Sequence, residues 1–264
     1  MNEYQFLKQK FQHPGYYILP PDIVYYILSF LVEKEANGFL FDEKKDGIWK
    51  LWSQNGKFSW KKNWKDGKKD GIWKSWFENG QLHQEEIWKD GKKNGIWKRC
   101  SQAGKLSWEK NWKDGKRDGI WKSWYDGKRS QEESWKDGKK DGIWKFWDQN
   151  EKLYREESWK NGKRDGIWKS WYDNGQRKYE HSCKDGKRNG MCKSWYENGQ
   201  LKCEKNWKDG KADGICKGWW KNGNPSAEEP WKDGGLDGIW KSWSPDGKPC
   251  SSEYWKGGTF MFTL

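Results

Sequence analysis

Apolar and aromatic residues recur along most of this chain with a fixed spacing. A glycine followed by an apolar residue, then Trp and Lys, or a near variant of that pattern, starts nine units. The spacing between units is 24 residues in every case but one, where it is 23. Runs such as 72–77 are rich in aromatic residues and have no 3.6-residue period, which favours short β-strands over helices. Positions are numbered below from the starting glycine as zero; these glycines are Gly47, Gly71, Gly95, Gly119, Gly142, Gly166, Gly190, Gly214 and Gly238.

Two glycine-containing pairs divide each unit into two strands. Asn-Gly, as at Asn79 and Gly80, is typical of two-residue type I′ turns because both central residues need a positive φ. Asp-Gly after Trp-Lys marks the second turn. With a two-residue Asn-Gly loop, positions that sum to 17 face each other, so Lys at position 3 faces position 14, which is Glu in seven units. Charge was not used to set this register, so the opposite-charge pairs support it.

The register also assigns residues to the two faces of the sheet. Trp at positions 2 and 17 shares a face with the aromatic residue at position 6 and Leu at position 11. The other face carries Ile at position 1, Lys at position 3, Trp at position 5 and Glu at position 14. An even period preserves this alternation. The 23-residue unit lacks one residue at 125–128, where we expect a bulge or an altered loop. If the usual loop has three residues instead, Asp126–Gly127 is the two-residue form and the faces exchange.

The predicted fold class is mainly β: one elongated, single-layer antiparallel sheet of tandem β-hairpins, twisted or curled. About 18 strands would make a rod roughly 85 Å long. One layer buries little, so contacts between rings supply most of the stability. Positions 2, 5 and 17 hold 23 of the 26 Trp residues. The tryptophans assigned a structural role are Trp73, Trp76, Trp88, Trp121, Trp124, Trp168 and Trp171.

Composition refines this interpretation. A net charge of +13 and 34% charged residues favour disorder, but 26 Trp residues argue against it. There is no apolar run long enough for a transmembrane helix, and the first residues lack the layout of a secretory signal. We therefore expect an intracellular protein that is not secreted.

The sequence gives no pattern typical of an enzyme, a cofactor or a metal site. The histidines are isolated, and no nucleophile-elbow, Walker or dinucleotide motif is present. Four of six cysteines stand where other units have Trp, as a single base change would produce. Cys183 and Cys192 flank one turn and are candidates to pair across it. The other two are Cys100 and Cys216.

A row of lysines is the main candidate binding surface. Position 18 is Lys in every unit, at the Asp-Gly turns, although Asp at position 19 partly cancels the charge. Such a row is either simply solvated or binds anionic lipid headgroups or acidic protein surfaces. Nucleic acid is disfavoured because acidic residues interleave with the basic ones. These lysines are Lys65, Lys89, Lys113, Lys136, Lys160, Lys184, Lys208, Lys232 and Lys256.

The units resemble the variant form of the MORN repeat, on the motifs Trp-Lys-Asp-Gly-Lys, Asp-Gly-x-Trp and Tyr-Glu-Asn-Gly-Gln. The resemblance covers nine repeats over 47–258, with a degenerate half-repeat at 38–46 and an apolar C-terminal cap at 259–264. It implies a hairpin array used for protein contacts, oligomerisation or membrane-lipid association, with no chemistry of its own.

The N-terminal 37 residues differ from the repeats and predict a capping helix that also resembles the opening of an F-box. This implies docking to a Skp-type ubiquitin-ligase adaptor. A short F-box-like helix joined to these repeats is similar to proteins encoded in multiple copies by large DNA viruses of amoebae, so a viral protein in host cytoplasm or virion is expected. The residues that carry the F-box resemblance are Leu19, Pro20, Ile23, Ile27, Leu28 and Leu31.

Three functions follow as hypotheses. The first is a non-enzymatic scaffold for protein–protein assembly, as a virion component or near a membrane, with homo-oligomers among its possible states. The second is an F-box-type substrate adaptor that recruits a ubiquitin ligase. The third is a glycan-binding Trp-repeat module, against which the high lysine content and the missing secretory signal count.

Overall fold

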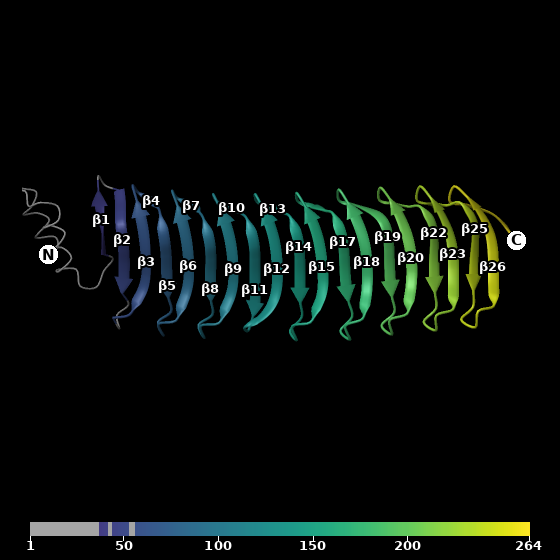
Figure 1. Cartoon of the computed structure of the whole chain (residues 1–264), viewed down its shortest axis with the longest axis horizontal. Coiled ribbons are helices and arrows are strands. Elements are labelled where there is room, and N and C mark those ends of the chain that lie inside the picture. Colours follow the sequence, from purple (N-terminus) through teal and green to yellow (C-terminus); the bar gives the residue numbers. More distant parts are fainter. Residues whose placement is uncertain (1–36, 42–43, 53–55) are drawn as a thin grey trace, which may run out of the picture.

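A computed structural model describes residues 37–41, 44–52 and 56–264. Every regular element in these ranges is a β-strand, and together they form one antiparallel sheet. The strands follow one another in chain order along the long axis (Figure 1). The predicted sheet of tandem hairpins is therefore confirmed. The predicted N-terminal helix, with its F-box-like residues, lies outside the described residues.

The strands comprise two long strands per unit and short two-residue strands at the Asp-Gly turns. The first part of the sheet contains β1 (Asn37–Phe41), β2 (Lys44–Trp52), β3 (Phe58–Lys65), β4 (Lys68–Lys69), β5 (Gly71–Trp76), β6 (Leu82–Lys89), β7 (Lys92–Lys93), β8 (Gly95–Cys100), β9 (Leu106–Lys113), β10 (Lys116–Arg117), β11 (Gly119–Tyr125), β12 (Lys128–Lys136), β13 (Lys139–Lys140) and β14 (Gly142–Trp147). The second part contains β15 (Leu153–Lys160), β16 (Lys163–Arg164), β17 (Gly166–Trp171), β18 (Arg177–Lys184), β19 (Lys187–Trp195), β20 (Leu201–Lys208), β21 (Lys211–Ala212), β22 (Gly214–Trp219), β23 (Pro225–Lys232), β24 (Gly235–Leu236), β25 (Gly238–Trp243), β26 (Pro249–Lys256) and β27 (Thr259–Thr263).

The starting glycine of each unit kinks the strand that contains it. Gly142, for example, has a φ of +100°, a conformation that costs little only for glycine. A Cβ at this position would lie 2.8 Å from the Cβ of Ser134 on the facing strand. The kink separates a two-residue strand such as β13 from the long strand β14. Glycine is therefore required here by both the backbone conformation and the space available.

The type I′ turn is at the other end of the hairpin from the one the sequence pattern indicated. Asp90 and Gly91 both have positive φ, +49° and +78°, as a type I′ turn requires. At the Asn-Gly end only the glycine has a positive φ, with Gly80 at +87°. The Gly80 N–H donates to the carbonyl of Phe77, so the usual loop has three residues and ends in a glycine bulge. The prediction of two-residue Asn-Gly turns is therefore wrong.

The predicted register nevertheless holds over most of the hairpin. Gly71 pairs with Trp88, and Lys74 pairs with Glu85, as the sum of 17 requires. A β-bulge between positions 4 and 5 compensates for the extra loop residue, so the faces do not exchange. Beyond the bulge the prediction fails, because Trp76 pairs with Leu82. Leu at position 11 therefore lies on the face of Trp at position 5, not on the predicted face.

The short unit contains the alternative loop that its sequence suggested. Asp126 and Gly127 both have positive φ, +49° and +82°, and join Tyr125 to Lys128 in a two-residue turn. The altered loop predicted for this unit is thus confirmed. From Gly119, which pairs with Trp135, the strands keep the register of the neighbouring units.

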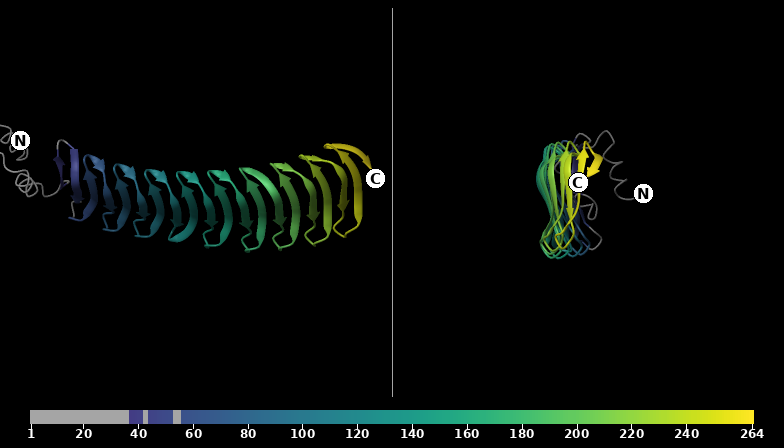
Figure 2. Two further views of the ribbon diagram at one scale, coloured as in Figure 1. Left: turned by 45° about the horizontal axis from the view of Figure 1, so that its top comes forward. Right: turned by 90° about the vertical axis from the view of Figure 1, so that its right-hand side faces the viewer.

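Burial is slight, as expected for one layer. In the part of the chain that the structure describes, no large side chain is fully buried. The strands are bowed and the row of hairpins follows a shallow arc (Figure 2). None of the described residues belongs to a helix long and apolar enough to cross a membrane.

Candidate functional site

One face of the sheet, here called the tryptophan face, carries the Trp residues at positions 2 and 17. Their rings alternate in a continuous row of ten indoles with centroids 4.8 to 6.0 Å apart. The rings are tilted relative to one another rather than parallel, an arrangement that aromatic quadrupoles favour. The row consists of Trp64, Trp73, Trp88, Trp97, Trp112, Trp121, Trp135, Trp144, Trp159 and Trp168.

Basic side chains at position 22 lie over these rings. The Nζ of Lys69 is 4.4 Å from the centroid of Trp73 and 4.1 Å from that of Trp88. The same arrangement recurs in the next units, with Lys or Arg at this position. Each such cation–π contact contributes about 0.5–1 kcal/mol at an exposed site. The sequence analysis did not assign a role to these cations, although Lys or Arg recurs at position 22 in most units.

The indole N–H groups are used within the sheet as well. The Nε1 of Trp121 donates to the carbonyl of Asn111 at 2.7 Å, and the equivalent bond recurs at position 2 of other units. At position 17 the indole donates to a Glu at position 15, as Trp88 does to Glu86 at 2.8 Å. Where position 15 is Lys, as at Lys110, the Nε1 of Trp112 is buried without a partner. The rings thus hold neighbouring hairpins together.

The opposite face carries an exposed apolar row, here called the isoleucine row. Position 1 is Ile in eight units and Met in one, and each side chain is 38–59% exposed. Position 1 lies on the face away from the indoles, so no part of the described sheet covers it. Successive members of the row are separated by position 16 of the intervening strand, which is Asn or Ser in six units, as where Ile120 pairs with Ser134. Exposed apolar side chains repeated on one face are nevertheless a candidate interaction site. The row consists of Ile48, Ile72, Ile96, Ile120, Ile143, Ile167, Met191, Ile215 and Ile239.

A ladder of alternating charge, here called the Lys–Glu ladder, runs beside the isoleucine row. Glu85 lies between Lys74 of its own unit and Lys98 of the next, and between Lys74 and Lys241 the sign of the charge changes from strand to strand. The Nζ of Lys74 is 2.7 Å from the Glu85 carboxylate. The predicted pairing of positions 3 and 14 is confirmed, and the structure adds the second Lys from the following unit. Trp76, Trp124 and Trp171 lie at position 5 on this same face.

The predicted lysines at position 18 are all exposed and lie along one edge, here called the lysine edge. Lysines at position 21 are exposed beside them. Successive turns on this edge are joined, since the Asp70 carboxylate accepts the Asp90 N–H at 3.1 Å and the Lys69 carbonyl accepts the Gly91 N–H at 2.8 Å. Some of the acidic residues therefore serve as backbone acceptors within the edge.

The Asn-Gly edge is held by a corresponding set of amide bonds. The Asn79 side chain donates to the carbonyl of Gln102 in the next unit at 2.8 Å and accepts the Gln81 N–H at 3.0 Å. The same pair of bonds occurs at Asn174 and Asn198. Asn is therefore used for its side-chain bonds rather than for a positive φ.

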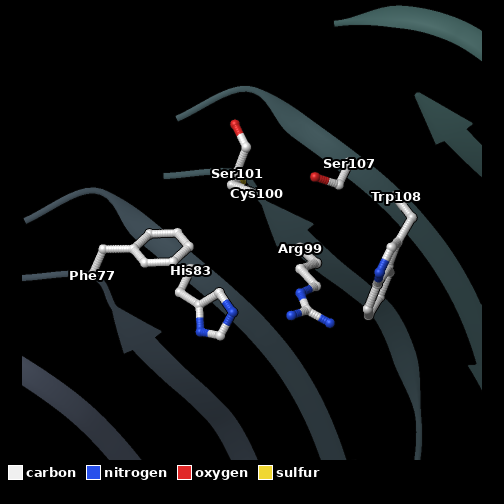
Figure 3. A pocket seen from close by; sticks show the side chains of 7 residues that line it. All are labelled: Phe77, His83, Arg99, Cys100, Ser101, Ser107 and Trp108. Carbon is white, nitrogen blue, oxygen red and sulfur yellow. The ribbon is translucent and has the colours of Figure 1, made fainter. Parts of the chain in front are cut away.

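A hollow of about 400 Å³ lies where one unit has lost two aromatic residues. Cys100 and Ser101 stand at positions 5 and 6, which hold aromatic residues in most units. Arg99 lies between the rings of His83 and Trp108 (Figure 3). This hollow lies at local substitutions of the repeat pattern. The other residues that line it are Phe77 and Ser107.

Thiols interrupt the tryptophan face after Trp168. Cys183 and Cys192 do not face each other: Cys183 pairs with Arg188, and Cys192 pairs with His181. Both are free thiols, so the predicted pairing across the turn is not formed. Burial, followed by the nearby charges of the arginines, lowers the pKa of His181 to about 4, so this imidazole is neutral at pH 7. Among the described residues, no group of three or more His, Cys, Asp or Glu is placed to hold a metal ion.

The fold defines the class of protein. It is an open array of tandem β-hairpins, in which adjacent hairpins contact each other through alternating Trp rings and hydrogen-bonded turns. Six segments match the family described as the MORN repeat variant, at residues 69–90, 140–161, 164–185, 188–209, 212–233 and 236–256. Six units of the chain are therefore similar to MORN variant repeats, a repeat type that generally acts as a protein- or membrane-interaction scaffold. No curated protein matches its sequence.

Solved structures add little to this identification. The crystal structure of TcdB2-TccC3 matches with 11% sequence identity and a TM-score of 0.21. The match covers 83% of this chain and 14% of the other. At this level of similarity it carries no argument about function.

Proposed function

We propose that this chain is a non-enzymatic repeat scaffold for protein assembly, and that it assembles with a second copy of itself through the isoleucine row. The observation that carries the proposal is nine exposed apolar side chains, one from every unit, on one face of the sheet. Each is 38–59% exposed, and together they extend across the whole array.

The Lys–Glu ladder favours a second copy as the partner. Its charges alternate between strands about 4.8 Å apart, so like charges recur every two strands. A partner surface of one charge sign has attraction and repulsion that cancel along such a ladder. A partner surface whose charges alternate with the same spacing can form an attractive pair at each strand. A second copy has that spacing, and two-fold symmetry would place Lys of one copy against Glu of the other. The net charge of +13 opposes association but is screened beyond about 8 Å at physiological ionic strength.

The test is sedimentation velocity over a range of protein concentrations at physiological ionic strength. The triple variant Ile96→Lys, Ile120→Lys and Ile143→Lys places three charges in the middle of the row. We expect the wild type to dimerise and the variant to remain monomeric with an unchanged circular dichroism spectrum. The matched variant with Val at the same three positions should still dimerise. A wild type that is monomeric throughout, or a Lys variant that associates as well as the wild type, would contradict the proposal.

The lysine edge supports a second candidate, binding to anionic membrane surfaces. Its lysines are exposed in every unit, and several neighbouring Asp carboxylates accept backbone N–H bonds. Each Lys near an anionic surface contributes about 1 kcal/mol. Co-sedimentation with vesicles that contain phosphatidylserine, compared with neutral vesicles, tests this. An unchanged affinity in the triple variant Lys113→Glu, Lys136→Glu and Lys160→Glu, which changes the charge of this edge by −6, would contradict this candidate.

The adaptor and glycan hypotheses remain predictions. A pull-down with Ile23→Ala and Ile27→Ala tests the first, since unchanged recovery of a ubiquitin-ligase subunit would remove it. For the glycan hypothesis, most indole N–H groups at positions 2 and 17 are bonded within the sheet, which leaves the rings of the tryptophan face few polar contacts for a sugar. Retention on immobilised glycans, and its loss on Trp substitution, would support it.

A further inference from the structure

The tryptophan face changes character near the C-terminal third of the array. Position 2 is Cys in the units that start at Gly190 and Gly214, where other units have Trp. Position 22 before the second of these is Ala212, which is buried, instead of Lys or Arg. This segment has therefore lost both the indole and the cation that lies over it elsewhere, and thiols occupy the space.

Two of these thiols touch. Cys203 is on β20 and Cys216 is on β22, the facing strand of the next unit, and their Sγ atoms are 3.6 Å apart. In the register Cys203 faces Gly218, so Cys216 is its diagonal neighbour on the same face. Gly218 is the only glycine at position 4 in the nine units. Gly218 has no side chain, and the Ser226 hydroxyl lies 2.6 Å from where a Cβ would be, while the two sulfurs remain in contact.

The surroundings make the two sulfurs unequal. Cys216 is 7% exposed, whereas Cys203 is only partly buried. The hydrogen bond from Cys216, helped by the charges of Lys205 and Lys202, lowers the pKa of Cys203 to about 7. The same hydrogen bond and burial raise the pKa of Cys216. Since the thiolate is the reactive form, Cys203 is the nucleophile of the pair.

The other nearby thiols have different partners. The Sγ of Cys192 lies 2.9 Å from the hydroxyl of Tyr179, and Cys183 lies opposite Arg188. Cys250 is exposed, and its sulfur contacts the carbonyl of Lys248 at 3.7 Å. Cys203 and Cys216 are thus the pair whose sulfurs are already in contact.

We propose that Cys203 and Cys216 form a redox site, which hydrogen peroxide oxidises to an intramolecular disulfide that joins β20 to β22. The Cys203 thiolate attacks one peroxide oxygen and breaks the O–O bond, which gives a sulfenic acid and, after protonation of the leaving oxygen, water. The Cys216 sulfur then attacks the sulfenic sulfur. The hydroxyl leaves with the Cys216 proton as a second water. Two thiols lose two electrons, and hydrogen peroxide is reduced to two waters.

The disulfide would replace a non-covalent contact between adjacent hairpins with a covalent one. The sulfurs must approach by on the order of 1.5 Å to reach the bond length of about 2.05 Å, so β20 and β22 must draw closer together at this diagonal. The joined strands belong to neighbouring units, so oxidation fastens the array where its indole row is interrupted.

The test is oxidation of the folded full-length protein with hydrogen peroxide, followed by blocking of free thiols, trypsin digestion and mass spectrometry. Trypsin separates the two cysteines into the peptides 203–205 and 212–217, so the disulfide appears as a linked pair. Reduced and oxidised samples are also compared in thermal unfolding. We expect the linked pair in the wild type and in the control Cys250→Ser, and neither linkage nor a rise in Tm in Cys203→Ser or Cys216→Ser.

Two results would overturn the proposal. One is that the main disulfide joins two chains, or joins Cys192 to either member of the pair. The other is that Cys203 accumulates higher oxidation states as readily in the wild type as in Cys216→Ser, which would show that Cys216 does not capture the sulfenic acid. Circular dichroism of both Ser variants establishes that they are folded, so a lost linkage reports on the thiols.

Discussion

The substitution Trp121→Ala tests the role of the indole row most directly. Trp121 is only 6% exposed. Its ring centroid lies 5.0 Å from that of Trp112 and 5.6 Å from that of Trp135. The guanidinium of Arg117 lies 4.6 Å from the ring, and the indole N–H donates to Asn111. The substitution removes all of these contacts at once.

The expected loss can be worked out from these contacts. A buried indole removes about 150–250 Å² from water, which corresponds to roughly 4–6 kcal/mol at about 25 cal/mol per Å². The alanine retains part of this, and measured Trp-to-Ala changes in cores are about 3–5 kcal/mol. The open edges of a single layer favour the lower end. We therefore expect a loss of about 3–4 kcal/mol in the free energy of unfolding.

Equilibrium unfolding in urea, followed by Trp fluorescence and by circular dichroism, measures this loss. Tyr125→Ala is the matched control, because Tyr125 is an aromatic residue on the same strand β11 and is 78% exposed. It should change the free energy of unfolding by less than about 1 kcal/mol. Equal losses in the two variants would refute the conclusion that the indole row, rather than strand pairing alone, stabilises the sheet.

Three further predictions concern single positions. Lys110→Glu should raise Tm. The Glu supplies an acceptor for the unpartnered Trp112 Nε1, and the substitution removes a partly buried ammonium group, whose pKa is lowered by burial. A lower Tm would show that the cation–π contacts of Lys110 contribute more. Gly142→Ala should lower the free energy of unfolding in urea by about 1–3 kcal/mol, and by more than Gly175→Ala does. Both residues have a positive φ, but of the two only Gly142 has a neighbouring side chain that an added Cβ would clash with. Equal losses in the two variants would contradict this. His181 has a folded pKa of about 4, so the unfolded chain takes up its proton first and stability falls as pH decreases from about 6.5 towards 4. His181→Gln should remove about 1–2 kcal/mol of that fall after allowance for solvent screening, and identical pH profiles would refute the assignment.

The fold could be predicted from the sequence because the repeat supplies the same evidence nine times. Spacing, turn residues and opposite charges at positions 3 and 14 all indicated one register, and the strands adopt it. The turn chemistry could not be assigned in the same way. Asn-Gly and Asp-Gly are both compatible with a type I′ turn, and only the three-dimensional loop shows which pair uses it. The error stayed local because a β-bulge restored the register.

The candidate surfaces were only partly visible in the sequence. Alternation placed Ile at position 1 on the face away from the indoles, but whether another layer covers that face depends on the whole fold. Cys203 was overlooked because it stands at position 13, outside the positions that Trp occupies. Its contact with Cys216 depends on a diagonal relation between strands of two units, which no spacing rule indicates.

The two-residue loop at Asp126–Gly127 shows which end of the hairpins tolerates a change in length. One residue is missing there, yet the strands on either side remain in phase with their neighbours. At the opposite end, a carbonyl bond ties each turn to the turn before it, and at most turns a carboxylate bond is added, so the loop length there is fixed. Foreign peptides inserted between Asn and Gly should therefore be tolerated and exposed at one edge of the sheet, one per hairpin. The same insertions at the lysine-bearing turns should separate adjacent hairpins.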